Sequence, residues 1–196
     1  MAIIGSNRQN VAPPRGATAQ PGAARIVGAI ELGTTSLRMA IARIEPNGQY
    51  RILEHLQQAV AIGKDTFTSG TVRRQTTETC VDVLRGFSRK LREYGITSDR
   101  DVVAVATSAI REASNRDTFV DRMHIATGME VRVLDEAEVN RLTYLSVYPL
   151  LRKDPSLRSK DTIVAEVGGG DTEVLILRRG QVSGSQTYRL GSLRLL

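Results

Sequence analysis

The chain has 196 residues, with 27 lysines and arginines against 21 aspartates and glutamates, two histidines and one cysteine. Its 41% of apolar residues suffices for a folded core, which excludes wholesale disorder. The single cysteine, Cys80, excludes an internal disulfide framework, and with so few histidines a Cys/His zinc site is not expected. Every apolar run falls well short of the ~20 residues of a membrane helix, so we expect no membrane partner. The single cysteine fits a reducing setting, so we expect a cytoplasmic location.

The first 25 residues differ in composition from the rest of the chain. Residues 1–25 carry three arginines and three prolines but no acidic residue, a composition typical of disorder. We therefore expect a disordered basic tail, which holds half of the net charge of +6. Since the positive excess then belongs to a solvated arm, it gives little support to nucleic acid as a partner.

From residue 26 onward, short apolar runs alternate with turn signals. Runs at 26–32, 37–44 and 50–60 predict a meander of three antiparallel strands. Apolar spacing and end signals then predict, in chain order, a helix over 72–94, a strand at 101–107, a helix at 115–127, a strand at 130–134 and a helix from 135 to 148 that Pro149 ends.

The opening pattern returns near the end of the chain. Residues 162–167, 172–177 and 181–190 predict three more strands, with a triple-glycine turn between the first two. We therefore divide the chain into the basic tail (1–25), a first α/β lobe (26–150), a polar linker (151–160) and the incomplete start of a second, similar lobe (161–196).

Both copies of the pattern place a glutamate at the end of a strand, just before a glycine turn. The first turn reads Glu31-Leu32-Gly33-Thr34-Thr35-Ser36, and the second reads Glu166-Val167-Gly168-Gly169-Gly170-Asp171-Thr172-Glu173. Glycines let backbone N–H groups approach phosphate oxygens, and a carboxylate beside them can hold Mg²⁺ or its water. The first turn alone is equally typical of an ordinary hairpin, but its repetition favours a pair of loops that clamps phosphates between two lobes.

The two turns resemble the phosphate-binding loops of the sugar kinase, Hsp70 and actin superfamily. Within it they are similar to those of the exopolyphosphatase and guanosine pentaphosphate phosphatase family, which usually read DLGSNS and DIGGGSTE. Three more stretches agree with that family: 106–113 (ATSAIREA) resembles ATSALREA, 127–131 (TGMEV) resembles the start of TGIEVEV, and 189–195 (RLGSLRL) resembles LPLGSVRL. The resemblance implies an α/β, ribonuclease H-like (actin-like ATPase) lobe, with a mixed five-stranded sheet and flanking helices, and the first strands of a second lobe.

The resemblance also implies an activity, the Mg²⁺-dependent hydrolysis of terminal phosphoanhydride bonds in inorganic polyphosphate or guanosine pentaphosphate, and it leaves a homodimer open. It implies phosphate binding by Gly33, Thr34, Thr35, Ser36, Arg111, Gly168, Gly169, Gly170, Asp171 and Thr172. It implies metal binding by Glu31 and Glu166, and catalytic roles for Glu173, Glu166 and Glu138.

The sequence departs from the family pattern at three acidic positions. Glu31 and Glu166 stand where the family has aspartates, and the extra methylene matters because Mg²⁺ demands near-octahedral geometry at ~2.0–2.1 Å. The family's ISGxEEARL stretch aligns with residues 134–142, which puts the expected general base on Val139. Glu138 could replace it only with a shifted helix, since neighbouring helical positions point ~100° apart. Alternatively, Asp135 and Glu138 form a capping pair at the start of a helix.

Two hypotheses therefore stay open. The first is an exopolyphosphatase-type hydrolase, impaired to the extent that Val139 removes its base. The second is a non-catalytic phosphate- or polyphosphate-binding regulatory module, or a truncated piece of a longer enzyme, since the strands after residue 161 lack helices to cover their other face. An ATP-dependent kinase is a third alternative, but the stretches 106–113 and 190–195 disfavour it.

Overall fold

The computed structural model describes residues 23–195, so the predicted tail lies outside the described residues except for its last three positions. Arg25, the last residue of that predicted tail, is the first residue of a strand and pairs with Asp101. Within 23–195, none of the helices combines the length and the apolar composition needed to cross a bilayer.

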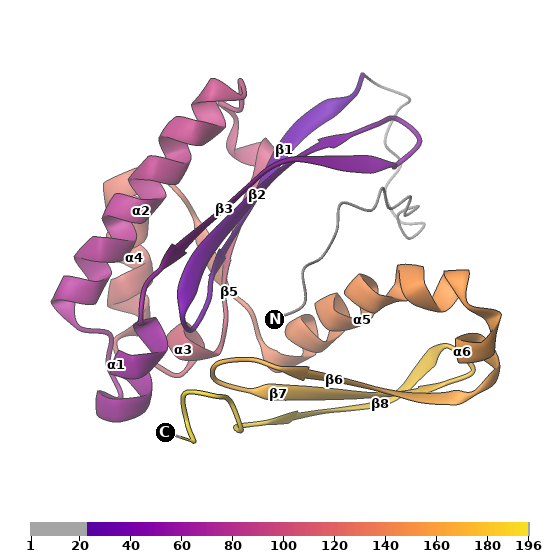
Figure 1. Cartoon of the computed structure of the whole chain (residues 1–196). Helices are drawn as coiled ribbons and strands as arrows, with labels where there is room; N and C mark the ends of the chain where they lie inside the picture. The colour runs from indigo at the N-terminus through magenta and orange to yellow at the C-terminus, as the bar shows by residue number, and fades with distance from the viewer. Residues whose placement is uncertain (1–22, 196) are drawn as a thin grey trace.

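A mixed five-stranded sheet forms the first structural unit (Figure 1). Its strands are β1 (Arg25–Leu32), β2 (Ser36–Ile44), β3 (Tyr50–Ala59), β4 (Val102–Ala106) and β5 (Val131–Val133). They lie in the order β3-β2-β1-β4-β5, with the first three strands antiparallel and β1, β4 and β5 parallel. This arrangement confirms the predicted meander and the predicted mixed sheet.

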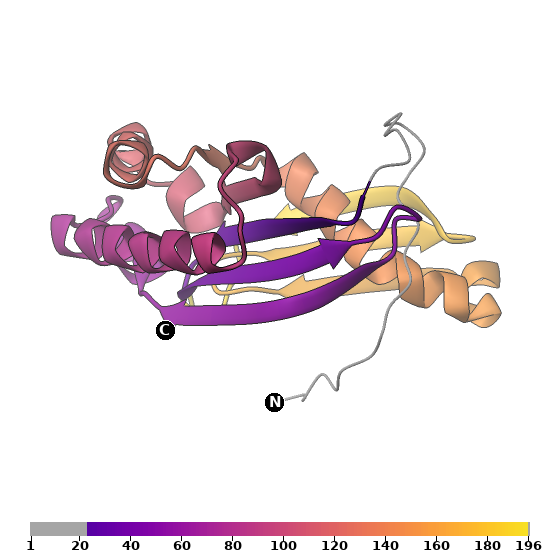
Figure 2. The ribbon, with the colours of Figure 1, turned by 90° about the horizontal axis from the view of Figure 1, so that it is seen from above.

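Helices cover this sheet and connect its parallel strands. They are α1 (Ile62–Ser69), α2 (Arg74–Glu93), the 3-10 turn η1 (Asp99–Asp101), α3 (Ser108–Arg111) and α4 (Arg116–Thr127). Helix α2 presents its apolar stripe to the core and its arginines to solvent, and α2 and α4 lie together beside the strands (Figure 2). Cys80 is buried on that stripe, where burial raises the pKa of its thiol to about 12. The cysteine is therefore a packing residue.

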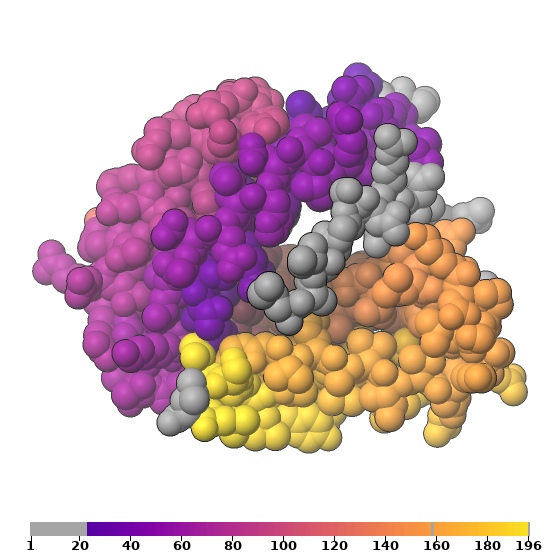
Figure 3. Space-filling view, in the orientation of Figure 1, coloured from indigo at the N-terminus to yellow at the C-terminus, as the bar shows by residue number. Residues whose placement is uncertain are grey.

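The second structural unit is a three-stranded antiparallel sheet with its own helix. Its strands β6 (Asp161–Val167), β7 (Thr172–Arg178) and β8 (Gln181–Tyr188) pair in chain order. Helix α5 (Glu136–Lys153) packs on this sheet, where Leu151, Leu175 and Leu177 form a small separate core. The strands of this unit meet the first unit at one end, close to the loop after β1 (Figure 3).

The prediction that Pro149 ends a helix is wrong. Pro149 lies inside α5 rather than ending it, because the helix continues to Lys153 and buries both Pro149 and Leu151. The predicted linker 151–160 contains the last turn of α5 and a short helix, α6 (Pro155–Ser159). Consequently the predicted boundary at residue 150 falls within a helix that packs on the second sheet.

Candidate functional site

The loop between β1 and β2 is tightened by its own backbone. The Gly33 amide donates to the Ser36 carbonyl at 3.0 Å, and a Cβ at Gly33 would lie 3.1 Å from that carbonyl oxygen. Helix α1 supports the loop, since the Gly63 amide donates to the Thr34 carbonyl at 2.8 Å. The side chain of Thr34 is buried, whereas that of Thr35 is exposed.

The triple-glycine loop between β6 and β7 is held from two sides. Within the loop, the Gly168 amide donates to the Asp171 carbonyl at 2.8 Å. From outside, the amides of Ser192 and Leu193 donate to the Gly168 and Gly169 carbonyls at 3.0 and 2.9 Å. The C-terminal residues 191–194 therefore fasten the second loop in place.

The triple-glycine loop packs against the first loop and against the start of α3 with little room for a side chain at Gly169 or Gly170. A Cβ at Gly169 would lie 3.0 Å from Thr34 Cγ2, and a Cβ at Gly170 would lie 2.5 Å from Ser108 Oγ. Between the two loops is a cavity of about 140 Å³. The structure thus brings together two loops that lie more than a hundred residues apart in the chain.

Nearly all of the predicted site residues line this cavity. They are Glu31, Gly33, Thr34, Thr35, Ser36, Arg111, Glu166, Gly168, Gly169, Gly170, Asp171 and Glu173. Two predicted residues do not line it. Thr172 donates its hydroxyl to the Leu190 carbonyl, and Glu138 lies at the start of α5.

Glu138 belongs to a capping box. The Asp135 carboxylate accepts from the Glu138 amide at 2.7 Å, and the Glu138 carboxylate accepts from the Asp135 amide at 3.2 Å. The predicted capping pair is therefore confirmed. Val139, the next residue, lines the cavity instead.

Three glutamates face the cavity from strand ends. Glu166 and Glu173 lie directly opposite each other on β6 and β7, and the Thr143 hydroxyl of α5 donates to Glu166 at 3.0 Å. Burial raises the pKa of Glu173, and the nearby charges of Glu166 and Asp171 raise it further. Glu31 is half-exposed and pairs with Arg38 at 3.5 Å.

Two carboxylates of the cavity, those of Glu31 and Glu166, are of the chemical type that binds Mg²⁺ together with phosphate oxygens. Within residues 23–195, no three or more acidic, histidine or cysteine side chains are grouped so that they alone could hold a metal ion. Mg²⁺ sites of phosphoryl-transfer enzymes usually supply one or two carboxylates and leave the remaining positions to water and substrate oxygens. The donors in the cavity are of that kind and number.

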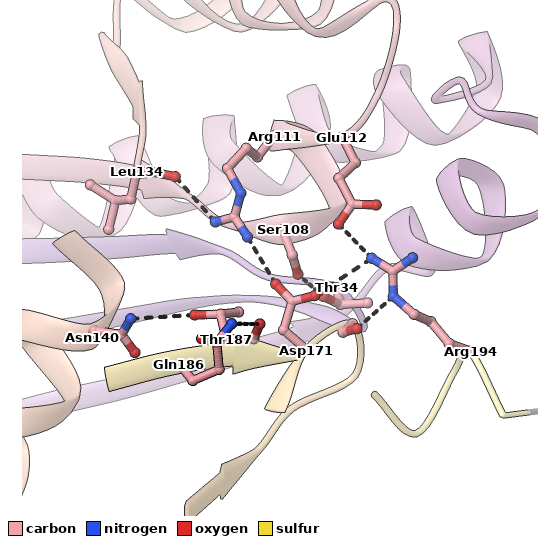
Figure 4. Close-up of polar contacts among 11 residues, drawn as sticks. Thr34, Ser108, Arg111, Glu112, Leu134, Asn140, Asp171, Gln186, Thr187 and Arg194 are labelled. Carbon is pink, nitrogen blue, oxygen red and sulfur yellow. Dashed lines mark hydrogen bonds and ion pairs between the residues drawn. The ribbon is translucent and has the colours of Figure 1, made fainter. Parts of the chain in front are cut away.

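Two arginines converge on Asp171 (Figure 4). Arg111 donates from Nη2 to Asp171 Oδ2 at 2.8 Å and from Nη1 to the Leu134 carbonyl at 3.3 Å. Arg194 Nη2 lies 3.5 Å from Asp171 Oδ1, pairs with Glu112, and its Nε donates to the Gly170 carbonyl at 2.6 Å. Burial raises the pKa of Asp171, and the two arginines oppose that shift.

Several residues of the site were not among the predicted ones. Ser108, Thr107 and Arg38 line the cavity, and Thr143 orients Glu166. Ser108 lies within the ATSAIREA stretch, so the motif itself was the available signal. Thr143 carried no signal, because its contact joins the middle of α5 to a strand 23 residues away.

Comparisons with known proteins agree with this geometry. Residues 40–196 match the model of the Ppx/GppA phosphatase family. Exopolyphosphatase 1 of Mycobacterium leprae is 24% identical over 148 residues, which cover 76% of this chain and 42% of that protein. A guanosine-5'-triphosphate,3'-diphosphate pyrophosphatase of Aliivibrio fischeri is 23% identical over 163 residues, which cover 83% of this chain and 31% of that protein.

The crystal structure of an exopolyphosphatase from Cytophaga hutchinsonii has a TM-score of 0.77 and 26% identity, over 87% of this chain and 52% of that one. This likeness confirms the predicted actin-like fold class, and the family match confirms the resemblance of the motifs. The chain spans about half, or less, of the length of each of these relatives.

Proposed function

This chain belongs to the Ppx/GppA phosphatase family, and from that premise we propose that it binds the end of a phosphate chain and hydrolyses the terminal phosphoanhydride bond. The proposed substrates are inorganic polyphosphate and guanosine pentaphosphate. The names of its relatives support this class, since they include an exopolyphosphatase and a guanosine-5'-triphosphate,3'-diphosphate pyrophosphatase.

One observation carries the proposal. The two glycine loops face each other across the cavity, so close that a Cβ at Gly169 would lie 3.0 Å from Thr34. Backbone N–H groups of such loops bind phosphate oxygens without the steric hindrance of side chains. Two unrelated hairpin turns would not be expected to lie with their glycines in contact.

Each group of the cavity has a role in this proposal. The loops and the hydroxyls of Thr34 and Ser108 hold the terminal phosphates, and Arg111 binds their oxygens. Glu31 and Glu166 hold Mg²⁺ together with the substrate. When bound, the ion neutralises phosphate charge and orients the chain end.

Glu173 is the residue that we propose as general base. It is a buried carboxylate of the cavity wall, and its raised pKa brings it closer to neutral pH, which suits a base that removes a proton from water. Glu138 is a weaker candidate because its carboxylate is bound in the cap of α5. Because position 139 holds a valine, which has no carboxylate, the proposed hydrolysis depends on Glu173 as its base.

Release of phosphate from polyphosphate and from guanosine pentaphosphate in the presence of Mg²⁺ tests the proposal. We expect release by the wild-type chain and a loss of ~10²- to 10⁴-fold in Glu173→Gln, the usual effect of removing a base. Glu130→Gln is the matched control, since Glu130 is exposed and does not line the cavity. Equal rates in wild type and Glu173→Gln would overturn the assignment of the base.

A second candidate function is phosphate binding without hydrolysis. Val139 favours it, because an apolar side chain lines the cavity at the position of the family's expected base. Titration calorimetry with tripolyphosphate distinguishes the two: binding without release of phosphate supports the module, and release that appears only in Val139→Glu identifies the missing group.

A further inference from the structure

The carboxylate of Asp171 is paired with Arg111, an arginine of the cavity that could otherwise bind phosphate. Asp171 directly follows the three glycines, and only 4% of its surface is exposed. Its Oδ2 accepts from Arg111 Nη2 at 2.8 Å, so the guanidinium that faces the cavity is already bound by an anion. Its other oxygen, Oδ1, is buried without a hydrogen-bond partner.

The remaining charges of the cavity make this pairing consequential. Among the described residues that line it, the acids are Glu31, Glu166, Asp171 and Glu173, and the arginines are Arg38 and Arg111. Arg38 is paired with Glu31 at 3.5 Å, and Arg111 is paired with Asp171. An incoming phosphate therefore meets more carboxylates than guanidinium groups, and both guanidinium groups already have a partner.

A second arginine gives Asp171 an alternative partner. Arg194 Nη2, which also pairs with Glu112, lies 3.5 Å from Oδ1, and Arg194 does not line the cavity. A rotation of the carboxylate toward Arg194 would satisfy the unpartnered Oδ1 and release Arg111. Because a charge left unpaired in a buried position is costly, this second partner makes the exchange feasible.

The geometry points to Asp171 as an internal competitor of the substrate: its carboxylate occupies Arg111 until a terminal phosphate displaces it toward Arg194. This inference rests on the proposed phosphate site and names the residue that sets its affinity. Asp171 is thus a specificity-determining residue, since weak or singly charged anions cannot displace it, whereas the multiply charged end of a phosphate chain can.

Binding of tripolyphosphate in the absence of Mg²⁺, measured by titration calorimetry, tests the inference without requiring hydrolysis. Asp171→Asn keeps the size of the side chain and removes its charge. We expect it to bind tripolyphosphate about tenfold more tightly than wild type, which corresponds to ~1.4 kcal/mol. Asp171→Glu, which keeps the charge, should not gain affinity.

Two controls separate competition at Arg111 from a general loss of negative charge. Glu173→Gln removes a charge from the same cavity but not from Arg111, and it should tighten binding less than threefold. In an Arg111→Gln background, Asp171→Asn should give no gain. A gain that persists there would show simple charge repulsion and overturn the inference.

An unchanged or weaker affinity in Asp171→Asn also overturns it. If that variant does not fold, Asp171→Ser, with a smaller side chain, provides the same comparison. This test and the test of the proposed function give separate results. If Asp171→Asn binds tripolyphosphate more tightly but the wild-type chain releases no phosphate, Asp171 competes with the substrate as inferred, and the proposed hydrolysis is refuted.

Discussion

Replacing Gly170 with alanine adds a methyl group at the contact between the two structural units. Its Cβ would lie 2.5 Å from Ser108 Oγ and 2.7 Å from Phe67 Cζ, well inside van der Waals contact. Neither neighbour is free to withdraw. Ser108 is 6% exposed, and the Phe67 ring lies against the Arg194 guanidinium, 3.9 Å from the ring centroid.

The expected loss of stability follows from these contacts. Inserting one carbon into a packed site typically costs ~1–3 kcal/mol, and two clashing neighbours place Gly170→Ala in the upper half of that range. The strain would be relieved by moving the triple-glycine loop away from Ser108. We therefore expect Gly170→Ala to bind tripolyphosphate more weakly as well as to unfold more readily.

Urea unfolding at equilibrium measures the effect, with Gly86→Ala as a matched control. Gly86 lies inside α2, and the nearest heavy atom to its added Cβ would be Arg89 Nη2 at 3.8 Å. Because glycine in a helix interior is ~0.5–1 kcal/mol less favourable than alanine, this control should stabilise the chain. The reasoning is refuted if Gly170→Ala is as stable as wild type, or if both substitutions destabilise equally.

Three further predictions concern the base, the cavity and the second core. Glu173→Gln should raise the melting temperature at pH 7 while slowing phosphate release by ~10²- to 10⁴-fold. Burial raises the pKa of Glu173 above its ordinary value of 4.5, so wild-type stability falls as the pH rises from that value through the raised pKa, and the melting temperature should depend less on pH in the variant. Val139→Glu should increase the rate of phosphate release by up to ~10²-fold if a carboxylate there can reach the attacking water, and an unchanged rate would show that it cannot. Leu151→Ala should cost ~2–5 kcal/mol in urea unfolding, because Leu151 is buried between α5 and the second sheet, whereas Leu150→Ala, at an exposed position, should cost little.

Local sequence signals were sufficient for most elements of the fold. The alternating strands and the apolar stripe of α2 carry their periodicity in the sequence, and Gly128, with a φ of 72°, marks the end of α4. Helix α1 could not be predicted in this way. Its buried residues include polar ones: Asp65 pairs with Arg73, and the Gly63 amide donates to Thr34 of the first loop, so no apolar stripe marks the helix.

Pro149 shows why the end of a helix can escape prediction. Proline removes a backbone donor and usually ends a helix. Here the residues after it bury Leu151 against Leu175 and Leu177, and this tertiary packing outweighs the local preference.

The candidate site could be predicted as a set of loops, but its charge pairing could not. The glycines and glutamates are visible as repeated motifs, whereas the bond from Arg111 to Asp171 joins residues 60 positions apart. Nothing in the sequence near either residue indicates the other. The assignment of Asp171 to phosphate binding stays a prediction, and its buried carboxylate restricts any such contact to the backbone amide.

Helix α5 determines how this chain can be dissected. Its capping box begins directly after the first sheet, while its last turns supply Leu151 to the core of the second. A cut at residue 150 would remove Tyr144 and Val147, which pack against Leu175 and Leu177, so we expect a peptide starting there to be less stable than one that keeps all of α5. A second unit that keeps all of α5 with its capping box begins at Asp135, and this boundary leaves Leu134, whose carbonyl accepts from Arg111, with the first unit.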